Sequence, residues 1–266
     1  MPQKDQYYQG LLLAFLGAMC LTPDALLVRL ANSSDWNILF WRGLYIALCL
    51  AILQLVQTKR IIWRNYIPLL KKEWVCAILS ALAILFFVLS VSHTSVANTL
   101  VILSIMPFFA ALISLFLLKE KIPLYTWVAI GFAFIGILIV FIDTLDNTGN
   151  LGKIFALLCA LTSALNMTLI RSDEKLNLGA IFIWGGLIVA AFSFLSQQDT
   201  AFDRENTLVL FLMGAMNALA FMFLGAGAKR IPSPEVGLMM LLETIIGPIW
   251  VWFVLQESPN VNALIG

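Results

Sequence analysis

The stretch GLLLAFLGAMCLTPDALLVR, residues 10–29, is almost wholly apolar, yet it contains a proline followed by an aspartate. A helix needs about 20 apolar residues to cross a hydrocarbon core about 30 Å thick, so this stretch predicts a membrane span. Asp24 lies inside that span, where an ionised side chain costs roughly 2.5–3.5 kcal/mol. Such residues are retained where they face a cavity or a partner, so Asp24 is a candidate functional residue.

The composition of the whole chain is that of a membrane protein. Of the 266 residues, 61% are hydrophobic and 12% are charged, whereas soluble domains carry roughly 25% charged residues. A soluble globular protein is therefore excluded, and a net charge of +1 offers no basic field for nucleic acid. The sequence has no catalytic motif and no metal-ligand spacing, so it predicts no enzyme, cofactor or metal site. The expected partners are a small-molecule substrate and the lipid bilayer.

Nine apolar segments are long enough to span the membrane, and the links between them hold most of the charged residues. The segments are residues 8–30, 36–57, 74–92, 96–118, 126–142, 151–170, 178–195, 208–228 and 236–255. The link at residues 58–73 has the pattern of a short amphipathic helix on the membrane surface. The sequence therefore predicts an all-α, multi-pass protein of the inner membrane.

Lysines and arginines are distributed unevenly between the two sides of these spans. With a cytoplasmic N-terminus, twelve fall on the cytoplasmic side and three on the outer side. The twelve are Lys4, Lys59, Arg60, Arg64, Lys71, Lys72, Lys119, Lys121, Arg171, Lys175, Lys229 and Arg230, and the three are Arg29, Lys153 and Arg204. Because cytoplasmic loops carry the excess of positive charge, this count predicts a cytoplasmic N-terminus.

The opening stretch returns later in the chain, which indicates an internal repeat. In a first register, segments 10–29 and 38–44 align with 152–171 and 180–186, and in a second register 106–120 aligns with 243–257. The chain is therefore expected to hold two copies of a five-helix unit, residues 1–147 with spans one to five and residues 148–266 with spans six to nine, without the tenth span. Because five is odd, the second repeat enters the membrane inverted, an arrangement typical of secondary transporters.

Several motifs resemble the EamA family of the drug/metabolite transporter superfamily. They are the repeats, FWRG (40–43), PFFAALISLFLLKE (107–120) and GFAFIGILIV (131–140). The resemblance implies ten transmembrane helices, two cytoplasmic termini, and export or exchange of small metabolites. The sequence departs from the family in ending at residues 258–266, where a tenth helix is expected to begin. It also has Thr244 after Glu243 where many relatives have proline.

The number of residues between a side chain and the end of its span gives its depth in the membrane, and this depth gives Asp24 an expected partner. Asp24 lies six residues before the outer end of the first span, and Arg42 lies six residues after the outer start of the second. Both residues are therefore about 9 Å from the same face. An ion pair between them is expected, either as a purely structural pair or as part of substrate binding or gating. The alternative is that Arg42 extends outward to the interface.

Glu243 lies eight residues into the last span, close to mid-membrane. A carboxyl group buried there can exchange protons near neutral pH, so Glu243 is the candidate for proton coupling, with a structural role as the alternative.

The remaining candidates are amides and tryptophans. Asn98, Asn166 and Asn217 are expected as mid-span amides that line the site or bond helices together, with Asn166 at the position equivalent to Asp24. Trp41 and Trp184 are expected as cavity walls or as interfacial anchors. His93, the only histidine, is expected at an outer turn, either solvated or as a gating group.

These observations predict a secondary transporter with a cavity between its two repeats. Alternating access would move small amphipathic or amino-acid-like solutes across the membrane, by export or exchange, with protons as the proposed coupling ion. The alternative is a non-transporting or degenerate relative with a scaffold role.

Overall fold

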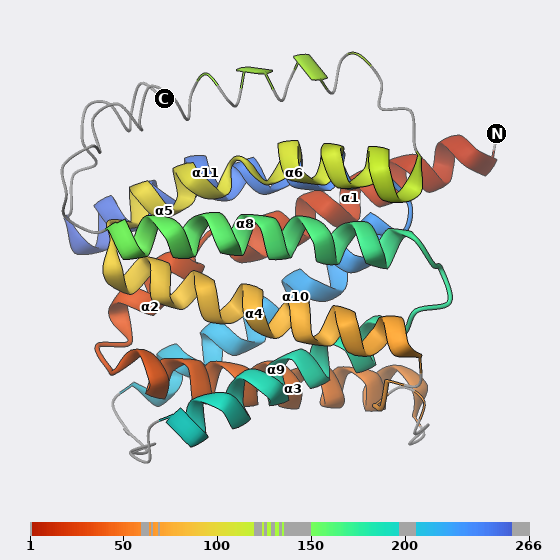
Figure 1. The fold of residues 1–266 in the computed structure, drawn as a ribbon. Coiled ribbons are helices and arrows are strands. Elements are labelled where there is room, and N and C mark those ends of the chain that lie inside the picture. The colour runs from red at the N-terminus through yellow and green to blue at the C-terminus, as the bar shows by residue number, and fades with distance from the viewer. Residues whose placement is uncertain are drawn as a thin grey trace.

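The computed structural model describes residues 2–59, 64, 66–68, 70–119, 124, 127–128, 131–132, 135, 150–196 and 206–256. These residues form helices joined by short turns, and no strand occurs among them. Figure 1 shows the long helices lying side by side in one bundle. The elements are α1 (Pro2–Leu21), α2 (Asp24–Leu30), α3 (Asp35–Thr58), α4 (Lys71–His93), α5 (Val96–Leu103), α6 (Met106–Ile113), the π-helix η2 (Ser114–Leu118), α8 (Asn150–Arg171), α9 (Leu178–Ser196), α10 (Thr207–Ala228) and α11 (Ser233–Leu255).

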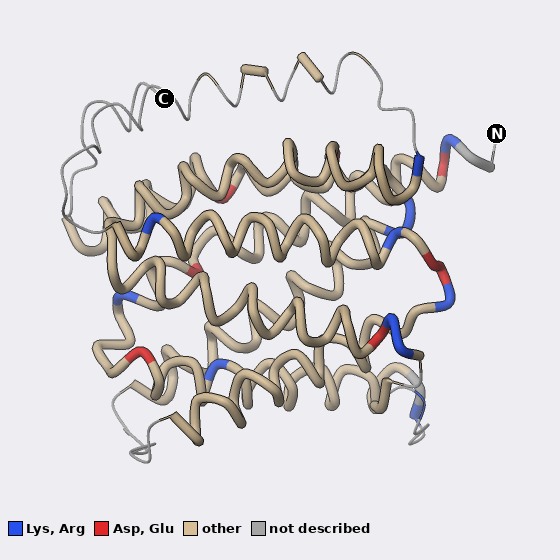
Figure 2. Tube along the Cα trace, in the orientation of Figure 1, with Lys and Arg blue, Asp and Glu red and all other residues tan. Residues whose placement is uncertain are grey.

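Within the described residues, eight helical stretches are long and apolar enough to cross a membrane. They are Lys4–Leu30, Asp35–Gln57, Lys71–His93, Val96–Leu118, Asn150–Arg171, Leu178–Ser196, Thr207–Ala228 and Ser233–Leu255. These bounds agree closely with eight of the expected spans. Most of the remaining span, residues 126–142, and much of the expected surface helix at 58–73 lie outside the described residues. Most charged residues drawn in Figure 2 lie at the two ends of the bundle.

Two of these described spans are broken near prolines. The first span consists of α1 and α2, which are separated at Thr22 and Pro23, and the fourth is broken between α5 and α6 at Ser104 and Ile105. Because proline lacks an N–H, Pro23 cannot bond to the carbonyl of Met19. The Thr22 hydroxyl donates to that carbonyl at 3.0 Å instead. The sequence predicts one continuous first helix, and the break instead makes Asp24 the first residue of a new helix.

Helices that are distant in the sequence pack closely in the bundle. The closest pairs include α3 with α9, α4 with α8 and α1 with α10. Glycines permit these approaches: a Cβ added to Gly43 would lie 2.5 Å from the Gly186 carbonyl oxygen, and one added to Gly17 would lie 2.9 Å from the Leu224 nitrogen. Small residues let helix backbones approach closely in membranes. The helix α10 packs against both α2 and α3, so residues of these three helices come close to one another.

Candidate functional site

Asp24 and Arg42 form a buried ion pair between α2 and α3. The Arg42 Nη2 atom lies 2.8 Å from Asp24 Oδ2, and both side chains are only 2% exposed. The expected ion pair is therefore present, and Arg42 does not extend to an interface. Because a buried charge without its partner is costly, removing one member of such a pair typically destabilises a protein by about 3–5 kcal/mol.

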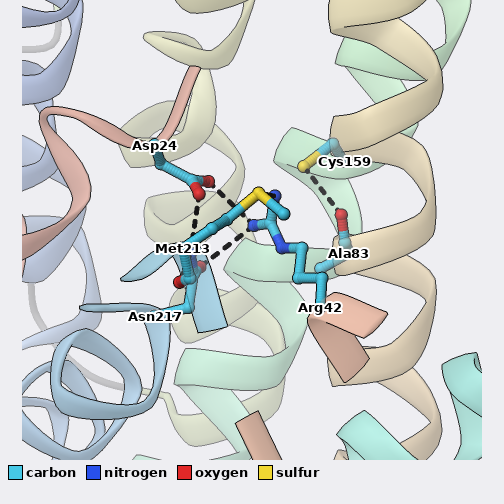
Figure 3. A network of polar contacts seen from close by, with 6 residues as sticks. All are labelled: Asp24, Arg42, Ala83, Cys159, Met213 and Asn217. Carbon is cyan, nitrogen blue, oxygen red and sulfur yellow. Dashed lines mark hydrogen bonds and ion pairs between the residues drawn. The ribbon is translucent and has the colours of Figure 1, made fainter. Parts of the chain in front are cut away.

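Asn217 on α10 joins this pair into a network of three side chains (Figure 3). Its Nδ2 donates to Asp24 Oδ1 at 2.6 Å, and its Oδ1 accepts from Arg42 Nη2 at 3.0 Å. The same Nδ2 lies 2.9 Å from the carbonyl of Met213, one turn earlier. Both carboxylate oxygens of Asp24 are thus bonded. These bonds offset part of the desolvation cost of the buried charges.

The rest of the Arg42 guanidinium lies against soft or apolar groups. Nη1 contacts the Met213 sulfur at 3.8 Å, and the guanidinium carbon lies 5.2 Å from the centre of the Phe87 ring. Nε has no hydrogen-bond acceptor among the described residues. Contact with an aromatic face stabilises a cation, although less strongly than an oxygen acceptor does. Arg42 therefore retains donor capacity beyond its bonds to Asp24 and Asn217.

A cavity of about 70 Å³ adjoins this network, which is space for several water molecules. Its polar lining includes Asp24, Arg42, Asn217 and Glu243, which come from four different helices. The walls are otherwise mainly apolar and include Phe87, Leu100, Met106, Phe221 and Met240. A mostly apolar cavity with a few polar groups is the usual form of a small-molecule site.

Glu243 faces this cavity from α11 and is 5% exposed. Its carboxylate makes no hydrogen bond within the described part of the chain. The adjacent Thr244 hydroxyl donates to the Leu100 carbonyl at 3.1 Å and thereby joins α11 to α5. Pro248, inside α11, lacks the N–H that would bond to the Thr244 carbonyl. Glu243 is therefore an acidic group in the cavity that is free to accept a hydrogen bond, a proton or a cation.

Asn166 does not line the cavity. It is buried on α8, and its Nδ2 donates to the Ser80 hydroxyl on α4 at 2.8 Å. The cavity is lined from α8 by Cys159 and Ser163 instead. The thiol of Cys159 donates to the Ala83 carbonyl at 3.3 Å, as Figure 3 also shows.

Three expected lining residues lie elsewhere. Asn98 is in the first turn of α5, where it donates to the Thr94 hydroxyl at 3.3 Å, so its expected mid-span position is wrong. Trp184, in the first half of α9, donates to the Tyr66 carbonyl at 2.8 Å, and Trp41 stacks on Tyr45 with ring centres 5.6 Å apart. Neither tryptophan lines the cavity. Adjacent positions on a helix point about 100° apart, so Trp41 does not share the direction of Arg42.

The sequence analysis did not identify the apolar cavity residues. Met213 precedes Asn217 by four residues, and that spacing places both on one face of a helix. The spacing could therefore have identified Met213 as a neighbour of Asn217. No comparable signal marks Phe87 or Phe221 among the 19 phenylalanines. His93 lies at the expected turn, with Nδ1 2.8 Å from the Leu89 carbonyl. No cluster of metal-ligating side chains occurs among the residues that the structure describes.

Comparisons with known proteins complement this geometry. The sequence model of the EamA-like transporter family matches residues 8–142 and 150–266. No curated protein matches the sequence. Among solved structures, 24 chains match. One of them, a crystal structure, is similar with a TM-score of 0.72 at 15% identity, and the match covers 96% of this chain and 91% of the other. At that identity the likeness shows the fold alone.

Proposed function

The chain belongs to the EamA-like transporter family, within the drug/metabolite transporter superfamily, and from this premise we propose that it is a secondary transporter of small metabolites. We propose that it moves amino-acid-like or amphipathic organic solutes across the inner membrane, by export or exchange. The observation that carries this proposal is the central cavity, where Asp24, Arg42, Asn217 and Glu243 meet largely apolar walls. Apolar walls suit the body of an amphipathic solute, and the polar groups suit its charged end.

Matched contacts in the two halves support an inverted repeat, with residues 1–147 and 148–266 as its units. In the two registers α1 is equivalent to α8, α3 to α9 and α4 to α10. The packed pair of α1 and α10 therefore has an equivalent in the packed pair of α8 and α4, and the equivalent helices α3 and α9 pack against each other. Two side-chain hydrogen bonds also join equivalent pairs of positions: Asn217 donates to Asp24, and Asn166 donates to Ser80. Asp24 aligns with Asn166 in the first register of the repeat, and Ser80 aligns with Asn217 in the second. Two equivalent halves can exchange shapes, which is the basis of alternating access.

We propose that Glu243 carries the proton that is exchanged for substrate. The carboxylate of Asp24 is held by Arg42 and Asn217, whereas Glu243 has no ion pair among the described residues. A proton and a cationic substrate group would therefore compete for Glu243, and that competition couples their movements. The pair of Asp24 and Arg42 would provide fixed, mutually balanced charges beside it.

Transport assays test both levels of the proposal. A resistance screen with toxic amino-acid analogues and organic cations, in cells that overexpress the chain, is expected to identify a substrate. In proteoliposomes, a pH gradient is expected to drive uptake of that substrate by the wild-type protein. Glu243→Gln is expected to abolish the gradient dependence, because glutamine cannot carry a proton. Glu174→Gln is the matched control, since Glu174 is an exposed residue in the link between α8 and α9.

Two outcomes would contradict these proposals separately. Uptake that is indifferent to the pH gradient, and unchanged by Glu243→Gln, would exclude proton coupling through this residue. A folded protein that transports no compound of the panel would favour the scaffold alternative.

A further inference from the structure

Two arginines make matching contacts with short connections between helices. Arg29 Nη2 donates to the Thr94 carbonyl at 2.9 Å, and Arg171 Nη1 donates to the Ile231 carbonyl at 2.9 Å. Thr94 lies just before α5, and Ile231 lies just before α11. Both of these helices line the cavity. Each arginine therefore ties the end of one helix to the beginning of a cavity-lining helix.

The two contacts lie at opposite ends of the bundle. Tyr7, near the start of α1, donates to Glu235 in the first turn of α11 at 2.8 Å. The connection that holds Ile231 is therefore beside the start of the first span. Arg29 lies at the far end of that same span, which runs over Lys4–Leu30. The two contacts therefore lie on opposite sides of the cavity, one toward each face of the membrane.

The two contacts are also equivalent under the repeat. Arg29 aligns with Arg171 in the first register, and Thr94 aligns with Ile231 in the second. These are the registers that align the two halves elsewhere. Each half therefore contains one such hydrogen bond. In both, a guanidinium donates to a main-chain carbonyl, and the two bonds have opposite orientations in the membrane.

A glycine packs against each connection. A Cβ added to Gly152, near the start of α8, would lie 2.8 Å from the Thr94 nitrogen. A Cβ added to Gly10 in α1 would lie 2.7 Å from the Cγ2 of Ile231. Gly10 and Gly152 are again equivalent positions, aligned in the first register. Each connection is thus held by an arginine bond from one helix and by close packing against a glycine of another, and both features are repeated.

We propose that these contacts are two latches that close the cavity at opposite ends, the Arg29 latch (Arg29, Thr94, Gly152) and the Arg171 latch (Arg171, Ile231, Gly10). The proposal rests on alternating access as the mode of transport. Both hydrogen bonds are formed in this structure. Access from one face requires the start of α5 or α11 to move away, which breaks one latch while the other remains closed. Because the bonds are alike, neither end is strongly favoured to open.

Sided access to the cavity tests this proposal. The reporter is Ser163→Cys, at a cavity-lining position of α8, in the full chain with its four native cysteines replaced by alanine. The rate of modification by a membrane-impermeant thiol reagent is measured in vesicles of each orientation. Asn32→Cys and Lys175→Cys, at exposed positions near Arg29 and Arg171, identify the face that each preparation presents.

Each arginine variant is expected to open one end. Arg29→Ala raises the labelling rate about tenfold from the Arg29 face, and Arg171→Ala raises it about tenfold from the other face, because a lost hydrogen bond to a charged donor shifts the population by this order. Arg230→Ala is the matched control, because Arg230 is exposed, lies beside Ile231 in the turn after α10 and bonds to the Ala226 carbonyl of α10. It is expected to leave both rates unchanged.

A second pair of variants removes no charge. Gly152→Ala and Gly10→Ala place a methyl group where the connections lie, and are expected to raise labelling from the same faces as Arg29→Ala and Arg171→Ala respectively. They keep the test decisive if an arginine variant fails to insert into the membrane.

The proposed latches would be contradicted by labelling rates that do not change, or that do not differ between the two faces. If neither the arginine nor the glycine variants change the rates, or if they raise them equally from both faces, the contacts do not close the cavity. Labelling does not depend on transport, so the two proposals fail separately: active transport with unchanged labelling contradicts only the latches, and sided labelling without transport contradicts only the proposed function.

Discussion

At the scale of single residues, the network of Asp24, Arg42 and Asn217 joins three helices through buried polar groups. Asp24 uses both carboxylate oxygens, one for Arg42 and one for Asn217. Opposite charges at 2.8 Å cancel much of each other's field, but neither charge is tolerable alone in an apolar interior. The network is therefore expected to behave as a unit, in which the loss of one member leaves the others buried without a partner.

A double-mutant cycle measures this dependence. Asp24→Leu and Arg42→Met are each expected to lower the free energy of unfolding by about 3–5 kcal/mol, because each leaves an uncompensated charge. The double variant leaves no charge and is expected to lose far less than the sum of the single losses. Unfolding of the purified protein, titrated with a denaturing detergent, gives the free energies. Additive losses would mean that the two residues are not coupled.

Sequence reasoning identified part of this network because depth along a span can be counted. Asp24 and Arg42 lie on successive antiparallel spans, so equal distances from one face bring them level. Asn217 could be proposed as an intramembrane amide, but its bonds depend on how α10 packs against α2 and α3, which counting does not reveal. Trp41 and Trp184 failed as cavity residues because residue type does not determine which way a helical side chain points.

At the scale of helices, the crossing of α3 and α9 depends on two glycines facing each other. A Cβ on Gly43 would meet the Gly186 carbonyl oxygen at 2.5 Å, and a Cβ on Gly186 would meet the Gly43 carbonyl oxygen at the same distance. The obstacle is backbone in both cases, so a side chain cannot rotate away to make room. In the proposed repeat α3 and α9 are equivalent helices, so this crossing would be a meeting point of the two halves.

Gly43→Ala is therefore expected to lower the free energy of unfolding by about 1–3 kcal/mol, the usual cost of overpacking. Gly225→Ala is the matched control, because its nearest neighbour would be the Phe182 ring edge at 3.0 Å, which is a side chain that can shift. Its expected effect is close to zero, since alanine also favours the helix. The same detergent titration measures both variants. Equal effects at the two positions would show that the crossing has room to relax.

At the scale of the whole molecule, the fold was largely predictable and its finer shape was not. Apolar segment length located the eight described spans, because bilayer thickness determines the length of a spanning helix. The breaks at Thr22 and Ser104 were not predicted, although Pro23 and Pro107 stood in the sequence. A proline can end a helix or merely bend it, and Pro248 lies inside an unbroken α11. Which outcome occurs depends on the neighbours that accept the freed carbonyl groups.

Orientation in the membrane is a further property of the whole molecule, and the distribution of charge predicts it. Twelve lysines and arginines on one side against three on the other predict a cytoplasmic N-terminus. A cysteine at Asp5, which is exposed near the start of α1, is expected to react with a membrane-impermeant thiol reagent only in inverted vesicles. Asn32→Cys, at the other end of the first span, is expected to react only in right-side-out vesicles. The opposite pattern would show that the N-terminus is outside. Because the two halves make matched contacts, that result would exchange the faces of the Arg29 and Arg171 latches and leave their geometry intact.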